Sequence, residues 1–242
     1  VFNNDEAFVF ISTDTSFSEV KDSLEPLLRD LDAFESAADK KGYSQNIKAG
    51  RYRIAKGMNN NEIINSLRVG NVPVKVAFNN QETLADLAGR IAVQIEADSI
   101  SLLIAFNNKE FLSKHQMDLE NSLALYVPNS YEFFWNTDAE EFRSRMLKEY
   151  NRFWSAPRKE KAKVLGLSPN EVVALASIVH KETAKIDERP KVAGLYLNRL
   201  RTGMLLQADP TVIYAIKKET GNFDTIIKRV LYKDLELESL YN

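Results

Sequence analysis

"LSPNEVVALASIVHKETAK", residues 167–185, is the stretch that decides the fold of the carboxy-terminal half of the chain. Ser168 is a favourable N-cap, Pro169 suits the first position of a helix, and Glu171 stands three residues after the cap. Ser-x-x-Glu at this spacing is a capping box, in which each side chain accepts a hydrogen bond from the other residue's backbone N–H. The sequence therefore predicts a helix that begins at Pro169.

Most apolar residues of this predicted helix fall on one arc, and Glu182 lies within the same arc. At about 100° per residue, Leu175, Ile178 and Val179 share a face. A carboxylate on a core-facing stripe is paired with a cation, kept protonated, or lining a cleft. The spacing leaves a second interpretation open, in which Glu182 is a partly exposed residue at a helix end that pairs with Lys185 or a neighbouring arginine.

The composition excludes several classes of protein. The chain has 242 residues, of which 44% are hydrophobic and 27% charged, as in an ordinary globular protein. Its net charge of -2 gives no basic excess for nucleic-acid binding. The absence of cysteine excludes disulfides, thiolate nucleophiles and cysteine-based zinc sites. The two histidines, His115 and His180, lack metal-binding spacing, so we expect no metal. There is no GxSxG motif, signal-peptide pattern or apolar run of about 18 residues.

The first half of the chain mixes strands and helices. Residues 7–27 and 74–95 each show a short strand pattern, a polar turn and an amphipathic helix. Between them the sequence predicts a β-hairpin-like piece around Ala49-Gly50 and a helix that ends at Gly70. The predicted fold class is α+β: a small mixed α/β region over residues 1–120, followed by a mostly helical domain over residues 121–242.

Later segments support this division. The run "LYVPNSYEFFW", residues 125–135, is dense in aromatic residues, which form either core or a platform for sugar rings. Further helices are predicted from Arg189 to Gly203 and from Asp209 to Gly221, where proline starts and glycine ends each helix.

The run "LASIVHKETAKIDERPKVAGLYLNRLRTGMLLQADPTVIYA", residues 175–215, resembles the MltG, or YceG-like, family of endolytic murein transglycosylases. The family's equivalent stretch has an ASIV-x-x-ET helix, an ER-P element, an N-R-L helix and an LQ-x-DPTV-x-Y turn. "YVPNSYEF" is similar to its F-P-D-T-Y segment, and "IKAGRYRIAKGMNNNEIINSLRVG" to an upstream element. The resemblance covers nearly the whole chain and likens the strand–helix units to LysM domains.

This resemblance implies cleavage of the β-1,4 bond between N-acetylmuramic acid and N-acetylglucosamine in nascent peptidoglycan, leaving a 1,6-anhydro end. It also implies a single amino-terminal membrane anchor outside this sequence, and a catalytic domain facing the periplasm or the outer cell surface. The implied partners are peptidoglycan glycan strands and cell-wall synthases, with no cofactor. The family pattern continues beyond Tyr241-Asn242, so a further carboxy-terminal part of the catalytic domain is expected.

The resemblance makes Glu182 the candidate catalytic acid. A lytic transglycosylase uses one carboxyl group twice: it protonates the glycosidic oxygen and then accepts the proton of the C6 hydroxyl as that oxygen closes on C1. A desolvated setting would favour the required protonated form. His180 replaces an acid that the family has two residues earlier, and more simply packs or hydrogen-bonds. Thr183 follows Glu182 as serine follows the catalytic glutamate in other lytic transglycosylases.

The same match assigns substrate contacts to Thr183, Asn198, Gln207, Asp209, Tyr131 and Tyr214. Other roles remain open for several of them. Asp209 before Pro210 also suits a helix N-cap, Asn198 could brace the Gln207 turn, and Arg199 could pair with Asp187 or Glu188.

An alternative function is a non-catalytic peptidoglycan-binding or scaffold module of the cell-wall synthesis machinery, in which LysM-like units bind glycan. His180 favours it, as does Leu123, which replaces an acid of the family pattern.

Overall fold

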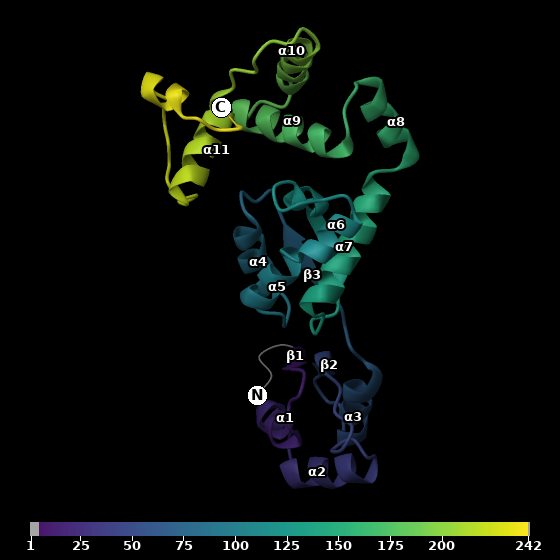
Figure 1. The fold of residues 1–242 in the computed structure, drawn as a ribbon. Coiled ribbons are helices and arrows are strands. Elements are labelled where there is room, and N and C mark those ends of the chain that lie inside the picture. The colour runs from purple at the N-terminus through teal and green to yellow at the C-terminus, as the bar shows by residue number, and fades with distance from the viewer. Residues whose placement is uncertain (1–4, 242) are drawn as a thin grey trace. The chain divides into compact units, whose positions relative to one another are not determined.

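The computed structural model describes residues 5–241, and it confirms the α+β class (Figure 1). The strands are β1 (Glu6–Ile11), β2 (Gly50–Ala55), β3 (Val74–Phe78) and β4 (Asn129–Phe133). The helices are α1 (Phe17–Leu24), α2 (Leu31–Lys40), α3 (Asn60–Val69), α4 (Leu84–Ala92), α5 (Ser99–Phe106), α6 (Lys109–Lys114), α7 (Ala139–Phe153), α8 (Ala156–Val164), α9 (Pro169–Glu182), α10 (Arg189–Arg201) and α11 (Asp209–Thr220). Short 3₁₀ turns occur at Glu25–Leu27, Ser122–Leu125 and Tyr232–Glu236.

The chain divides into two compact units. The first unit runs through Ser122 and includes Tyr126–Lys148, and the second comprises Leu123–Leu125 and the residues from Glu149 onward. The four strands all belong to the first unit, and the second is built from helices and short turns. The start of the catalytic domain at residue 121 stays a prediction, because a division into compact units does not show which residues take part in catalysis.

Each of the two sheets in the first unit is an antiparallel pair. β1 pairs with β2 from Glu6 opposite Ala55 to Ile11 opposite Gly50, and β3 pairs with β4. The predicted hairpin at Ala49-Gly50 is therefore wrong: β2 has its partner in β1, about 40 residues away. The strand pattern that starts at Gly50 is real, but pairing is set by which apolar faces must be buried together.

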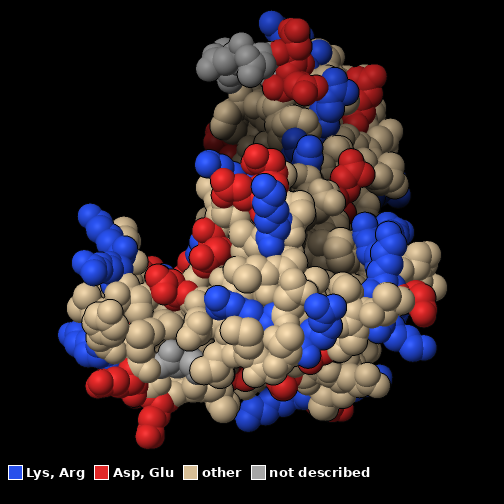
Figure 2. Space-filling view, turned by 90° about the horizontal axis from the view of Figure 1, so that it is seen from above, with Lys and Arg blue, Asp and Glu red and all other residues tan. Residues whose placement is uncertain are grey.

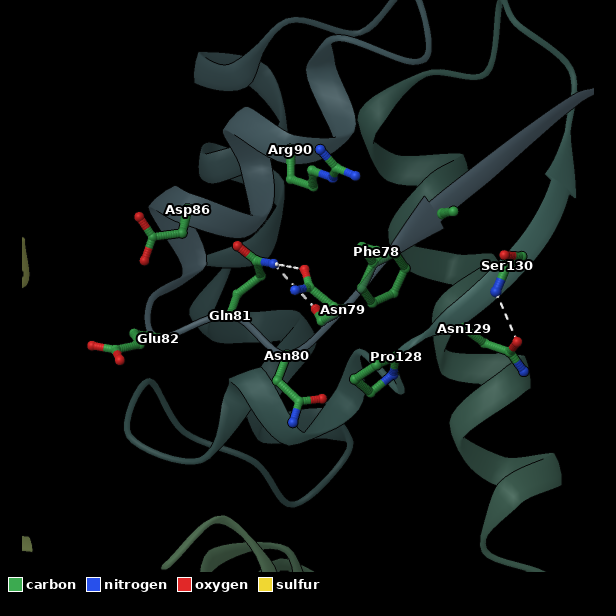
Figure 3. A pocket seen from close by; sticks show the side chains of 11 residues that line it. Phe78, Asn79, Asn80, Gln81, Glu82, Asp86, Arg90, Pro128, Asn129 and Ser130 are labelled. Atoms are coloured by element: carbon green, nitrogen blue, oxygen red, sulfur yellow. Dashed lines mark hydrogen bonds between the residues drawn. The ribbon is translucent and has the colours of Figure 1, made fainter. Parts of the chain in front are cut away.

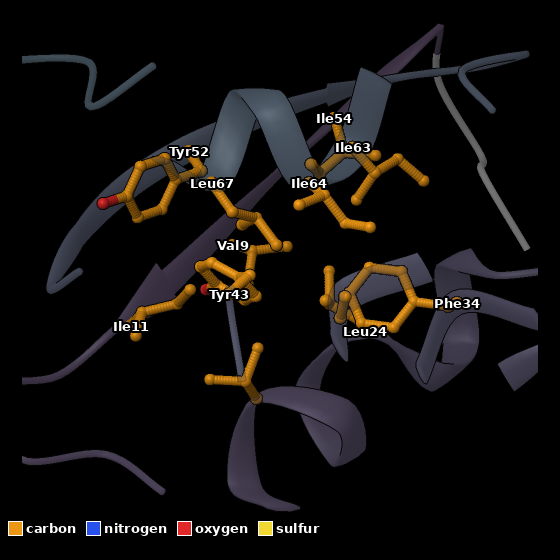
Figure 4. Packing of buried hydrophobic residues seen from close by; sticks show 12 residues of the cluster. Val9, Ile11, Leu24, Phe34, Tyr43, Tyr52, Ile54, Ile63, Ile64 and Leu67 are labelled. Atoms are coloured by element: carbon orange, nitrogen blue, oxygen red, sulfur yellow. The ribbon is translucent and has the colours of Figure 1, made fainter. Parts of the chain in front are cut away.

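The core of the first unit's amino-terminal part is aromatic and β-branched. Side chains of β1, β2 and three helices converge on it (Figure 4). Its largest members, Phe34, Tyr43 and Tyr52, are 0–1% exposed. Burying a side chain of this size removes about 150–250 Å² from water, so these rings account for much of the stability of this part.

The aromatic run at residues 125–135 contributes mainly to the core. Tyr126 and Phe133 are buried, and Phe133 stacks on Phe142 of α7 at a ring separation of 4.8 Å. Phe134 is exposed, as expected where strand side chains alternate between faces. The core interpretation therefore holds for the inward-facing members of this run.

No single helix within residues 5–241 has the length and apolar character of a membrane span, although the bent pair α8 and α9 passes that test when taken together.

Candidate functional site

Glu182 is the last residue of α9, and the predicted capping box starts this helix. The Ser168 hydroxyl accepts from the backbone N–H of Glu171 at 3.3 Å, and the Glu171 carboxylate accepts from the Ser168 N–H at 2.7 Å. Thr183 has extended backbone angles of φ -139° and ψ 134°, and these end the helix. The local sequence therefore sets both ends of α9 and places the carboxylate at its carboxy-terminal end.

Of the two interpretations of Glu182, the structure agrees with the one that exposes its side chain at the helix end. Leu175 and Val179 of α9 are buried against α10 and α11, whereas Glu182 is exposed. The apolar arc is real, but its buried part ends at Val179, because the neighbouring helices cover only the earlier turns. Lys185 does not pair with Glu182, however, since its ammonium group contacts Glu188 at 3.0 Å.

Tyr196 of α10 is a buried residue on which the charge of Glu182 acts. Its side chain is 3% exposed. Burial raises the pKa of Tyr196, and the negative charge of Glu182 raises it further. The phenol is therefore a neutral hydrogen-bond donor across the physiological pH range.

Two charged residues from neighbouring segments also act on Tyr196. Asp209 raises the pKa of the tyrosine through its negative charge, and Arg199 lowers it through its positive charge. The charges of Glu182, Asp209 and Arg199 therefore all act on one buried phenol. Tyr196 was not predicted to be a site residue, because a tyrosine inside "GLYLNRL" is also typical of the buried face of a helix.

Arg199 also holds the turn that precedes α11. Its Nη1 donates to the backbone carbonyl of Leu206, so the predicted pairing with Asp187 or Glu188 is not the contact it makes. The next residue, Gln207, has a φ of 48°, in the left-handed region that side chains disfavour. Gln207 is exposed. The guanidinium thus stabilises a strained turn next to the carboxylates.

Asp209 is the first residue of α11 and not its N-cap. The N-cap is Ala208, and no side chain caps this helix end by a hydrogen bond. The structural role considered for Asp209 therefore falls away, and its exposed carboxylate lies in the first turn. A negative charge there is favoured by the helix dipole.

Two further residues of the predicted site organise local structure. The Thr183 hydroxyl donates to Glu188 at 2.9 Å and accepts from the Lys185 N–H at 3.1 Å, within the loop between α9 and α10. Asn198 is exposed, and its carbonyl oxygen accepts from Arg201 at 3.1 Å. Their assignment as substrate contacts stays a prediction. Arg199, and not Asn198, provides the hydrogen bond that braces the turn before Gln207.

The two tyrosines predicted to stack on sugars both make ring contacts inside their own units. Tyr214 of α11 has edge contacts with Phe223 and Tyr241, at ring separations of 5.8 and 4.9 Å. Tyr131 of β4 belongs to the first unit, where its hydroxyl donates to the Val127 carbonyl at 2.6 Å and its ring lies 5.9 Å from that of Phe78. Their sugar-stacking role also stays a prediction.

The first unit holds a separate open pocket of about 940 Å³ (Figure 3). It lies between the end of β3, the loop that follows, α4, and the start of β4. Amide side chains dominate its lining, which comprises Ala77, Phe78, Asn79, Asn80, Gln81, Glu82, Asp86, Arg90, Pro128, Asn129 and Ser130. The sequence indicated only a polar turn here. The run of four amide and acid side chains from Asn79 to Glu82 is the sequence feature that could have indicated a polar binding pocket at this position.

Hydrogen bonds hold part of the pocket wall in place. Gln81 donates through its amide to the side-chain oxygen of Asn79 at 2.7 Å, and Asp86 accepts from the backbone N–H of Thr83 at 3.0 Å. With two carboxylates and one guanidinium group in the lining, the pocket carries a slight negative charge. It therefore suits an uncharged polar ligand better than a phosphate or other anion.

Within the described part of the chain, no group of three or more His, Asp or Glu side chains is placed to hold a metal ion. Basic and acidic side chains are interspersed on the face drawn in Figure 2.

Comparisons with known proteins agree with this organisation. An endolytic murein transglycosylase from Bacillus subtilis is 27% identical over 227 residues, covering 87% of this chain and 61% of the relative. One from Streptococcus pneumoniae is 26% identical over 86% of this chain and 42% of the relative. This chain therefore spans about two fifths to three fifths of the length of these curated relatives.

A solved structure of a yceG-like protein from Listeria monocytogenes shares the fold. Its TM-score is 0.59 at 24% sequence identity, over 98% of this chain and 82% of that one. The YceG-like family pattern matches residues 9–242, which is nearly the entire sequence. The chain belongs to the YceG-like family.

Proposed function

We propose that this chain carries the catalytic region of an endolytic lytic transglycosylase that cleaves the bond between N-acetylmuramic acid and N-acetylglucosamine. The observation that carries the proposal is the exposed carboxylate of Glu182 at the carboxy-terminal end of α9. The names of the family's curated relatives support the reaction class.

The exposure of Glu182 fits a polymeric substrate. A glycan strand can reach the carboxyl group only if protein does not cover it, and the structure leaves it open to solvent. The sugar rings themselves would then exclude water from the carboxyl group during the reaction. Partial loss of solvent favours the neutral form of a carboxyl group, so the bound substrate would supply the desolvation that the sequence-based hypothesis assigned to the protein core.

The reaction needs one proton donor and acceptor. In the first step the Glu182 carboxyl group gives its proton to the glycosidic oxygen, and the bond from C1 to that oxygen breaks. In the second step the Glu182 carboxylate takes the proton of the C6 hydroxyl, and the bond from O6 to C1 forms. The proton returns to Glu182 and water is not consumed, so the product carries a 1,6-anhydro ring.

Residues beside Glu182 supply polar contacts for the sugars. Asp209 and Gln207 are exposed within the turn that Arg199 holds, and we assign them hydrogen bonds to sugar hydroxyl or acetamido groups. Asn198 and Thr183 are secondary candidates because both already have partners. No cofactor enters this scheme.

We further propose that the first unit binds glycan in its amide-lined pocket. Amide groups both donate and accept hydrogen bonds, as sugar hydroxyl and acetamido groups require, and the weak negative charge disfavours anions. Anchoring at the outer face of the cytoplasmic membrane and association with cell-wall synthases complete the proposal, on the basis of family resemblance.

The catalytic proposal is tested on purified glycan strands. The unmodified protein should release fragments with anhydromuramyl ends, detected by mass spectrometry, and Glu182→Gln should reduce their formation by at least about 100-fold. Glu160→Gln, on the exposed face of α8, is the matched control and should retain activity. A folded protein without anhydro products would falsify the catalytic proposal and leave the non-catalytic binding module as the better function.

The binding proposal has its own measurement. Titration with chitotetraose, followed by NMR, should shift amide signals of the pocket, and Asn129→Ala should weaken the shifts. Asn61→Ala, an exposed amide on α3, is the control. Shifts that spare the pocket would exclude it as the glycan site.

A further inference from the structure

The sheet formed by β1 and β2 has one buried face and one exposed face that carries aromatic rings. The buried face packs into the core through Val9, Ile11, Tyr52 and Ile54 (Figure 4). Because side chains alternate along a strand, Phe8 and Phe10 point to the opposite face, where they are 37% and 46% exposed. Exposed apolar surface gathered in one place indicates an interaction site, unlike a single exposed apolar residue.

Arg51 of β2 lies against one of these rings. Its guanidinium carbon is 3.6 Å from the centroid of the Phe8 ring, and its Nη1 donates a hydrogen bond to the Pro73 carbonyl at 3.0 Å. Arg51 is opposite Phe10 in the strand register, so it reaches Phe8 diagonally across the sheet. The cation–π contact and the hydrogen bond together hold the guanidinium group beside the ring.

The positive charge of Arg51 is open to a ligand. Arg53, the other arginine on this face, forms an ion pair with Glu6. Arg51 has no carboxylate partner among residues 5–241. A guanidinium group presents several N–H donors in a geometry that matches a carboxylate. The face is therefore complementary to a ligand that combines an apolar surface with a carboxylate.

Trp135 extends the aromatic surface from the end of β4. Its ring packs edge-on against Phe10, with ring centroids 5.1 Å apart and an interplanar angle of 68°. The Trp135 carbonyl accepts from the backbone N–H of Glu96 at 2.8 Å, and the Glu96 carboxylate accepts from the Thr13 hydroxyl at 2.9 Å. We call Phe8, Phe10, Arg51 and Trp135 the aromatic face. Its members are held by neighbouring residues, so a ligand would meet a largely preformed surface.

We propose that the aromatic face binds a peptide-bearing saccharide, with a sugar ring on Phe8 and Phe10 and a carboxylate of the peptide on Arg51. The choice of this ligand rests on the proposed function. The C–H groups of a pyranose ring pack on an aromatic ring, and the peptides attached to N-acetylmuramic acid carry carboxylates. The amide-lined pocket, with its slight negative charge, suits uncharged sugar groups instead. The aromatic face is thus the site that recognises the peptide.

A binding measurement with two saccharides tests the proposal. Glu182→Gln protein, which should not cleave the ligand, is titrated with N-acetylglucosaminyl-N-acetylmuramyl tetrapeptide and with chitobiose, which has two sugar rings and no carboxylate. Both should shift the NMR amide signals of β1 and β2. The tetrapeptide ligand should bind about tenfold more tightly, as for one hydrogen bond to a charged group. Adding Arg51→Gln should remove this preference.

Matched substitutions separate the guanidinium group and the rings from general effects. Arg53→Gln should keep the preference within about twofold, because the Arg53 charge is already paired with Glu6. Arg51→Lys keeps the positive charge, so it should bind the tetrapeptide ligand more tightly than Arg51→Gln does. Circular dichroism verifies that each variant is folded.

A second pair of variants tests the sugar-binding ring. Phe8→Leu should weaken binding of both saccharides by about fivefold, because it removes an aromatic surface that both use. Phe153→Leu is the control. Phe153 belongs to the second unit, is 36% exposed, and has the Arg158 guanidinium carbon 4.1 Å from its ring centroid. It resembles Phe8 in exposure and in its arginine contact, and its loss should leave binding unchanged.

Three results would overturn the proposal. A tenfold preference that survives in folded Arg51→Gln would show that Arg51 does not bind the carboxylate. Tetrapeptide shifts that spare β1 and β2 would exclude the face. Shifts that follow protein concentration and neither saccharide would identify a second copy of this chain as the occupant. Anhydro-end formation by the unmodified protein is measured separately, so its absence would remove the catalytic proposal while binding at the face would still support this inference.

Discussion

Arg199 of α10 donates a hydrogen bond from its guanidinium group to the backbone carbonyl of Leu206, and this contact joins α10 to the turn before α11. The same guanidinium group acts electrostatically on Tyr196, so one side chain connects the strained turn with the phenol beside Glu182. The turn and the proposed catalytic carboxylate are therefore expected to respond together when Arg199 is changed.

Replacing Arg199 by lysine should destabilise the second unit by about 1 kcal/mol, because a lysine ammonium does not reproduce the directed geometry of a guanidinium group. Urea denaturation followed by circular dichroism measures the change. Arg201→Lys is the control, since Arg201 is exposed and donates to the side chain of the neighbouring Asn198. Equal loss of stability in both variants would contradict a special role for the Arg199 contact.

The left-handed backbone of Gln207 is strained for a residue with a side chain, so substitutions at this position should change stability according to how easily each residue adopts that backbone. Glycine adopts a φ of 48° without steric cost, whereas valine does not. We expect Gln207→Val to destabilise the protein by about 1–2 kcal/mol, and Gln207→Gly to change stability by less than about 0.5 kcal/mol. Because the side chain is exposed, packing should not obscure the comparison. Similar unfolding midpoints for the two variants would argue that the turn relaxes in solution.

The capping box of α9 predicts a dependence of stability on pH. The backbone N–H of Ser168, followed by its hydroxyl, lowers the pKa of Glu171 below its usual value of 4.5. A lowered pKa in the folded state means that the contribution is present above about pH 4.5 and is lost as pH falls through the folded value. The stability difference between the unmodified protein and Glu171→Gln should therefore shrink on acidification from pH 7 to pH 3. A stability difference that stays constant between pH 7 and pH 3 would contradict this contribution of Glu171.

Ser168→Ala tests the other half of the same box. Loss of an N-cap hydroxyl costs about 1 kcal/mol in typical helices, and the accepting contact from Glu171 is 3.3 Å long in this helix. We expect a loss of that order in urea denaturation at pH 7. An unchanged midpoint would mean that Pro169 and the tertiary contacts alone suffice to start the helix.

Tyr43 and Tyr52 make a matched pair in the core of the first unit. Both are buried, yet the Tyr52 hydroxyl donates to the Lys48 carbonyl at 2.9 Å, whereas the Tyr43 hydroxyl has no recorded hydrogen-bond partner among the described residues. Tyr52→Phe should destabilise by about 1 kcal/mol, and Tyr43→Phe should be neutral or stabilising, because it removes an unsatisfied polar group. The midpoints of thermal unfolding of Tyr52→Phe and Tyr43→Phe, compared with that of the unmodified protein, measure both effects. Loss of stability in Tyr43→Phe would reveal a partner for that hydroxyl, such as a buried water.

Much of the local structure could be read from residue order because the signals are short in range. Ser168 and Glu171 marked the beginning of α9, and Gly221, with a φ of 65°, ended α11 where a glycine is favoured. Two strand–turn–helix units were also predicted, and they correspond to β1 with α1 and β3 with α4. Strand pairing was not predictable in the same way. β2 pairs with a strand about 40 residues earlier, and nothing next to Gly50 specifies that choice.

The sequence by itself determined where α9, α10 and α11 begin, and it singled out Glu182 through the residues around it. Only the tertiary structure decided how Glu182 is presented. Periodicity gives the face of a helix on which a side chain lies, but not how far the neighbouring helices cover that face. α10 and α11 cover α9 as far as Val179, so Glu182 lies in solvent. The turns of α9 that these helices cover carry Leu175 and Val179, which are buried.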